Sequence, residues 1–237
     1  MKILALETSA KAVSVAVAEA GKVLASAYQN VGLTHSVTLM PLLDAMLKNA
    51  GLTTGDMGCI AVANGPGSFT GLRIGVSAAK GLAWSLELPC CGVSTLAAMA
   101  QNLRTFDGLI VCAMDARRNQ VYNALFEAKD GALTRLCPDR AICLDELAEE
   151  LKSCEKSKIV VGDGAELCYN GLLNRDIPCQ IAPPALVMQN AVGVALTACE
   201  MAQRGETVSA RDLVPVYLRL SQAERERLAK GLPITLD

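Results

Sequence analysis

The feature that most constrains the fold is an internal repeat of two strand-rich segments that lie 108 residues apart. Residues 3–29 alternate short apolar runs with turns, which is the pattern of an antiparallel meander. Residues 109–137 follow the same plan, and a gapless superposition puts Asp115 on Glu7. It also puts Val121, Ala124 and Leu125 on Val13, Ala16 and Val17. The sequence therefore predicts a duplicated α/β fold with an active crevice between the copies.

Helices and further strands are predicted after each meander. In the first half, Thr34 caps a helix that ends near Gly51, residues 59–64 form a buried strand, and a second helix spans residues 70–86. In the second half, a capped helix begins at Asp145, residues 158–164 form a strand, and a long helix spans residues 185–204. Two prolines, at 183 and 184, are expected to open this last helix, and Gly205 to close it. This organisation predicts an N-terminal lobe of residues 1–103 and a C-terminal lobe of residues 104–237.

Composition limits the partners that the chain can have. Hydrophobic residues make up 51% of the chain and charged residues 19%, so some apolar surface is expected to contact another chain. The net charge of −2 argues against a broad basic face for nucleic acid, so that an RNA role would need a partner. The ten cysteines form no C-x-x-C pair, which excludes a zinc ribbon and favours reduced cysteines used in packing. No segment has the pattern of a signal peptide or a membrane span, which predicts a cytoplasmic protein.

The strongest local motif is the glycine-rich loop NGPGSFTGLRIG at residues 64–75, between a predicted strand and a predicted helix. Gly65 and Gly67 permit a tight turn, and free amides at the helix start could hold an anion. The loop matches neither a Walker A motif nor a dinucleotide-binding motif. Phosphate binding and a glycine turn for close packing both remain open.

Carboxylates at matching strand ends form a second candidate site. Glu7, next to Thr8, and Asp115 could hold magnesium near a phosphate, although salt bridges or turn capping explain them as well. Gly162 ends another predicted strand, which suits contact with a nucleotide such as ATP or ADP or an ordinary turn. The turn after Asp115 contains two arginines and no glycine, which argues against a kinase.

His35 is the only histidine, so a serine–histidine–acid mechanism would have to use it. Leu39 stands four residues later, where a second histidine would complete a metal pair. A capping or surface role for His35 is therefore favoured.

The two helices of the first half are predicted to form a pairing surface for another helix. Gly71, Gly75, Ala79 and Ala83 recur at every fourth position, which makes one helix face nearly flat. The preceding helix has an apolar arc wider than one packed face needs. The alternative is that both helices only face their own sheet. The candidate contact residues are His35, Leu39, Leu42, Met46, Gly71, Arg73, Gly75, Ala78, Ala79 and Leu82.

Several motifs together resemble the TsaB (YeaZ) family: GPGSFTGLRIGVSAAKGLA at residues 65–83, DARRNQVY at residues 115–122, and the motif at residues 215–224. That family is related to the tRNA threonylcarbamoyl transferase TsaD and has the actin/sugar-kinase/Hsp70-like ATPase fold. The resemblance implies that the 185–204 helix packs back on the N-terminal lobe. Residues after 231 are expected to form a loose tail, as terminal residues often do.

The resemblance also implies a non-catalytic subunit that binds and activates TsaD for threonylcarbamoyl transfer to the adenosine beside the anticodon. The tRNAs concerned read codons starting with adenine, and tRNA is met only through the complex. The two N-terminal helices would pair with TsaD, or with a second copy when TsaD is absent, and the ATPase TsaE would dock on the pair. The alternatives are an ATP-dependent phosphotransferase that uses Glu7, Gly65, Gly67 and Asp115, or a peptidase.

Overall fold

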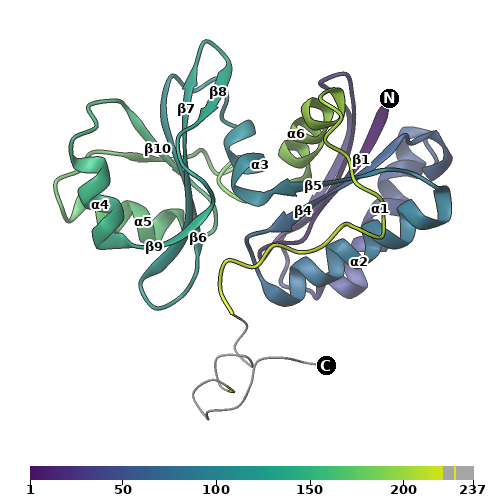
Figure 1. The fold of residues 1–237 in the computed structure, drawn as a ribbon, viewed down its shortest axis with the longest axis horizontal. Coiled ribbons are helices and arrows are strands. Elements are labelled where there is room, and N and C mark those ends of the chain that lie inside the picture. Colours follow the sequence, from purple (N-terminus) through teal and green to yellow (C-terminus); the bar gives the residue numbers. More distant parts are fainter. Residues whose placement is uncertain (221–226, 228–237) are drawn as a thin grey trace.

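The computed structural model describes residues 1–220 and residue 227. The last residues of the 215–224 motif and the predicted tail after residue 231 lie outside this part of the chain. Two mixed sheets dominate the described part, and α3 (Thr95–Gln101) and α6 (Ala191–Gln203) lie between them (Figure 1).

The first sheet has the strand order β3-β2-β1-β4-β5. β1 pairs antiparallel with β2 and parallel with β4, so the predicted meander and the strand at residues 59–64 are confirmed. The strands are β1 (Lys2–Glu7), β2 (Val13–Glu19), β3 (Lys22–Gln29), β4 (Cys59–Gly65) and β5 (Cys90–Ser94).

The second sheet repeats this order as β8-β7-β6-β10-β11, and β9 pairs with β7. Its strands are β6 (Gly108–Asp115), β7 (Gln120–Lys129), β8 (Ala132–Arg135), β9 (Arg140–Cys143), β10 (Lys158–Val161) and β11 (Gln180–Ile181). The repeated strand order confirms the duplicated α/β architecture that the sequence predicts.

Each sheet carries helices on both faces. α1 (His35–Ala50) and α2 (Phe69–Leu86) pack on the face of the first sheet that presents Leu4 and Leu6, and α6 packs on the opposite face. On the second sheet, α4 (Leu144–Lys152) and α5 (Ala165–Leu173) cover one face, and α3 contributes to the core on the other. A short 3₁₀ turn, η1 (Thr54–Asp56), precedes β4. No helix in the described residues combines the length and apolarity that a membrane span needs.

The last helix begins later than the sequence predicts. α6 starts at Ala191, and the segment after the two prolines forms only a turn, in which Leu186 N and Val187 N donate to Pro183 O over 2.8 and 3.0 Å. Its N-cap is Asn190, whose side chain accepts hydrogen bonds from Val192 N and Gly193 N. The predicted end at Gly205 is confirmed by its left-handed φ of 73°. The α4 cap is also different, since the helix follows Cys143 without a side-chain cap.

The internal repeat is confirmed, but the gapless superposition is one residue out in the first strand. In the second sheet, Asp115 pairs with Val121, which the superposition puts on Val13. In the first sheet, Glu7 pairs not with Val13 but with the next residue, Ser14. Side chains alternate along a strand, so a shift of one residue moves them to the other face of the sheet. Asp115 therefore corresponds to Thr8 rather than to Glu7.

Candidate functional site

Glu7 is the last residue of β1, and its carboxyl group is completely buried. The backbone N–H of Ser9 donates to Oε1 over 2.6 Å, while Oε2 has no hydrogen-bond partner among the described residues. Burial raises the pKa of Glu7 to about 7, with a smaller rise from the charge of Asp163, against hydrogen bonds from Ser9 that lower it. This carboxyl group is therefore partly protonated near neutral pH.

Asp163, in the turn after β10, interacts electrostatically with both Glu7 and Asp115. Burial raises its pKa, although Gln189 Nε2 donates to Oδ1 over 2.8 Å. Gln189 is itself buried, and its Oε1 lacks a partner in the described part of the chain. The fold thus gathers the predicted Glu7 and Asp115 around two residues that the sequence analysis missed. The GDG sequence at 162–164 was a signal for Asp163, whereas nothing marks Gln189.

This cluster does not have the form of a metal centre. Within residues 1–220 and 227, no group of three or more histidine, cysteine or acidic side chains has the arrangement to hold a metal ion. Asp115 is exposed, and its Oδ1 accepts the backbone N–H of Arg117 over 2.7 Å. Asp115 therefore caps its own turn, which is one of the three roles that the sequence left open for it.

The protein's own backbone fills the space next to the glycines that the sequence offers for nucleotide binding. A Cβ at each would collide with a carbonyl oxygen: Val216 O at Gly65, Ser9 O at Gly67 and Ala113 O at Gly162. Ser68 N also donates to Ser9 O over 2.7 Å, and Thr8 Oγ1 donates to Gly71 O over 2.8 Å. These contacts support the close-packing interpretation of the glycine loop.

The small-residue face of α2 is not a surface for another helix, so that prediction is wrong. A Cβ at Gly71 would meet Thr8 O, and a Cβ at Gly75 would meet Thr8 Oγ1. Ala79 and Ala83 are buried in the core of the first sheet. The stripe exists because the turn after β1 passes directly beneath α2. The same core contains two further candidate contact residues, Leu39 and Met46.

The opposite faces of α1 and α2 remain open in the chain. Val37 and Met40 on α1 are 63% and 44% exposed, and Trp84 on α2 is 72% exposed. Among the candidate contact residues, Arg73 is exposed, whereas His35, Leu42, Ala78 and Leu82 are half-buried. Val37 and Met40 are not among the predicted contact residues, because they lie outside the apolar arc that α1 uses in the core.

His35 fastens the start of α1 to the turn after β1. Its Nε2–H donates to Ala10 O over 2.7 Å, and Nδ1 is buried without a partner among the described residues. Thr34 precedes α1 as predicted, but its side chain makes no capping bond. His35 is thus half-buried and structural in this chain.

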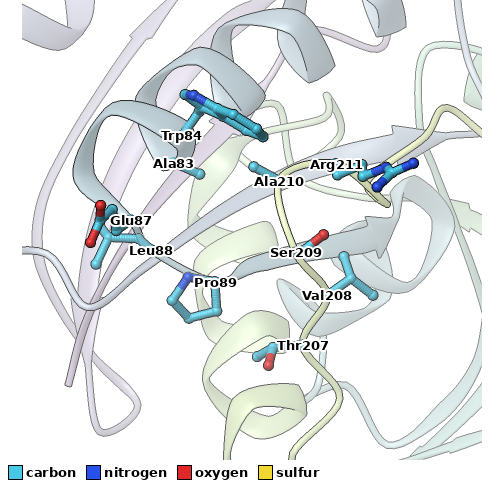
Figure 2. A pocket seen from close by; sticks show the side chains of 10 residues that line it. All are labelled: Ala83, Trp84, Glu87, Leu88, Pro89, Thr207, Val208, Ser209, Ala210 and Arg211. Atoms are coloured by element: carbon cyan, nitrogen blue, oxygen red, sulfur yellow. The ribbon is translucent and has the colours of Figure 1, made fainter.

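A groove of about 630 Å³ lies at the end of α2. Figure 2 shows its two sides, with Ala83 and Trp84 on α2 and Glu87 directly after it on one side, and residues 207–211 of the returning chain on the other. The groove extends the open apolar surface of α2 toward residues 207–211.

The turn that follows Asp115 has an unusual backbone. Arg117, Arg118 and Asn119 have φ values of 61°, 56° and 57°, so three successive non-glycine residues lie in the left-handed region. Each such residue costs about 1–2 kcal/mol, so surrounding contacts must hold the turn in place. Both arginine side chains are exposed.

Comparison with known proteins gives consistent results over nearly the whole chain. A family model described as TsaD, tRNA N6-adenosine threonylcarbamoyltransferase, matches residues 29–224. The tRNA threonylcarbamoyladenosine biosynthesis protein TsaB of Bacillus subtilis is 37% identical, and the match covers 94% of this chain and 96% of that protein. The protein of the same name from Escherichia coli is 32% identical over 92% of this chain and 95% of its own length. A solved structure of YeaZ from Pseudomonas aeruginosa has a TM-score of 0.78 and 29% identity, covering 92% of this chain and 99% of that one.

Proposed function

Because the chain belongs to the TsaB family of tRNA threonylcarbamoyladenosine biosynthesis proteins, we propose that it is the non-catalytic subunit that binds and activates TsaD. In this proposal TsaD transfers the threonylcarbamoyl group to the adenosine beside the anticodon of tRNAs that read codons starting with adenine. TsaE docks on the pair, and two copies of this chain pair when TsaD is absent. The tRNA meets the chain only within this cytoplasmic complex.

The open outer face of α1 and α2 is the observation that carries the proposal. Val37, Met40 and Trp84 are large apolar side chains that stay exposed although the core beneath them is complete. Exposed aromatic and methionine side chains are typical of the centre of a protein interface. We therefore place the contact with TsaD on these residues and Arg73, in place of the buried small-residue face.

The glycine loop supports a non-catalytic role. Backbone amides that a phosphate would need are used within the chain, since Ser68 N donates to Ser9 O and Gly162 N donates to Val187 O, each over 2.7 Å. Glu7 is buried and partly neutral, which weakens it as a ligand for a hard cation. We accordingly assign the threonylcarbamoyl transfer reaction to TsaD.

The experiment is threonylcarbamoyl transfer to tRNA by the matching TsaD and TsaE, with and without this chain, together with size-exclusion co-elution with TsaD. The proposal expects transfer only when the chain is present, and a stable pair with TsaD. Equal transfer by TsaD alone, with no complex, contradicts it.

A matched pair of variants locates the surface. Met40→Glu puts a charge on the outer face of α1 and should weaken TsaD binding at least about tenfold. Leu136→Glu changes a side chain of similar exposure, 48%, directly after β8 of the second sheet, and should leave binding unchanged. Asp115→Ala should keep most of the transfer activity, because a scaffold does not use this carboxylate for chemistry.

A further inference from the structure

Residues 207–219, here called the strap, return from α6 along the first sheet and α2. Cys90 N donates to Val208 O over 2.8 Å, and Val208 N donates to Cys90 O over 2.9 Å, so the strap begins as a bridge to β5. Further on, Val216 N donates to Asn64 O over 2.7 Å. Figure 1 shows this yellow segment crossing in front of α2 and β4.

Side chains of α2 hold the strap at two levels. Lys80 Nζ donates to Arg211 O and Leu213 O over 2.9 and 3.0 Å. Nearer the start of the helix, Arg73 Nε donates to the Tyr217 hydroxyl over 3.2 Å. The Tyr217 ring stacks on Phe69 with centroids 4.5 Å apart, and the Arg73 guanidinium lies over the same Phe69 ring at 4.0 Å. Arg73 therefore joins the outer surface of α2 to the strap.

The far end of the strap is bonded to the second sheet. The Arg219 guanidinium donates to Ala116 O, in the turn between β6 and β7. That turn contains the three left-handed residues 117–119. The turn is also held by Ala116 N to Gln120 O over 3.0 Å, Gln120 N to Arg117 O over 3.2 Å, Arg117 N to Asp115 Oδ1 over 2.7 Å, and Leu144 N to Asn119 O over 3.4 Å. Arg219 thus constrains the turn of the second sheet from a segment that lies along the first sheet.

We propose that the strap couples the outer face of α2 to the turn at residues 116–120, so that a protein covering α2 tightens this turn. The inference rests on the proposed function for the identity of that protein, TsaD. Covering Arg73 removes water from the contact with Tyr217, and a hydrogen bond is stronger in such surroundings. The more firmly held strap then keeps Arg219 on Ala116, and the turn opens less often.

The first test uses the free chain, with amide hydrogen exchange at Ala116, Arg117 and Gln120. Arg73→Ala, distant from these amides in sequence, should speed their exchange about fivefold, the change expected for the loss of one ordinary hydrogen bond. Arg219→Ala should do the same. Arg211→Ala is the matched control, because only the backbone oxygen of Arg211 bonds to Lys80. Unchanged exchange in Arg73→Ala overturns the coupling whether or not TsaD binds.

The second test repeats the measurement with TsaD present. Binding should slow exchange at the three amides about fivefold in the wild-type chain and have no such effect in Arg219→Ala. If TsaD binds both chains and slows the exchange equally, the strap is not the connection. If TsaD binds neither the wild-type chain nor Arg219→Ala, the proposed function fails. The free-chain test then still decides whether the strap couples α2 to the turn.

Discussion

Replacing Glu7 with glutamine tests the buried carboxyl group directly. Glutamine keeps an acceptor for Ser9 N, which donates to Glu7 over 2.6 Å, but it cannot ionise. Wild-type Glu7 must lose its proton in a completely buried position when the pH rises. The variant is therefore expected to gain stability relative to the wild type as the pH increases.

The magnitude follows from the two pKa values. The folded-state pKa of about 7 lies above the reference value of 4.5, so the folded chain binds more protons than the unfolded chain between these values. The free energy of unfolding of the wild type falls as the pH rises through this window and levels off above it. The complete effect is about 3 kcal/mol, and most of it develops between about pH 5 and about pH 8.

Urea unfolding of both proteins at these two pH values provides the assay. Any constant cost of burying the glutamine amide cancels when the stability difference at one pH is subtracted from that at the other. Glu166→Gln, at an exposed position on α5, is the control and should show little change with pH. If the stability difference between Glu7→Gln and the wild type changes by less than about 0.5 kcal/mol between the two pH values, the raised pKa of Glu7 is refuted.

Two further matched pairs test the packing of α2 and the capping of α6. Gly75→Ala should destabilise the fold by about 1–3 kcal/mol, because its Cβ would collide with Thr8, whereas Gly81→Ala has open space and should stabilise it by about 0.5–1 kcal/mol. Asn190→Ala should cost about 1 kcal/mol, and Thr34→Ala less than about 0.5 kcal/mol, since the Asn190 side chain makes capping bonds and the Thr34 side chain makes none. Thermal unfolding measures the stability of all four variants. Equal effects within the glycine pair contradict the packing of Gly75 against Thr8, and equal effects within the other pair contradict the cap at Asn190.

Local signals predicted much of the fold. The ends of α1 and α2 follow from periodicity and from Gly51, and the first meander follows from its turns. The start of α6 was missed because Pro183 and Pro184 looked like an opening signal, although the N-cap with the required bonds is Asn190. β5 and α3 were also missed, although Ser94, whose side chain accepts Ala97 N, is an ordinary capping residue.

The candidate site was harder to predict, because it depends on contacts between distant residues. The stripe of Gly71 and Gly75 indicates a close approach, but the sequence does not say whether the approaching group is a partner helix or Thr8, 63 positions from Gly71. Glu7 and Asp115 look equivalent in a gapless superposition, and only the strand register shows that their side chains differ by one position. The electrostatic link from Glu7 to Asp163 likewise needs both sheets in place.

The position of α6 on the first sheet also determines when this protein can fold during synthesis. Ser14 on β2 accepts the backbone N–H of Ala191, 177 positions later. At about 5–20 residues per second, the ribosome needs roughly 10–35 s to make the intervening chain. Throughout that interval the strand face that presents Ile3 and Ala5 lacks α6 and is open to wrong partners, including other nascent chains. The two halves repeat in sequence, yet the first cannot complete its core until the second has been made.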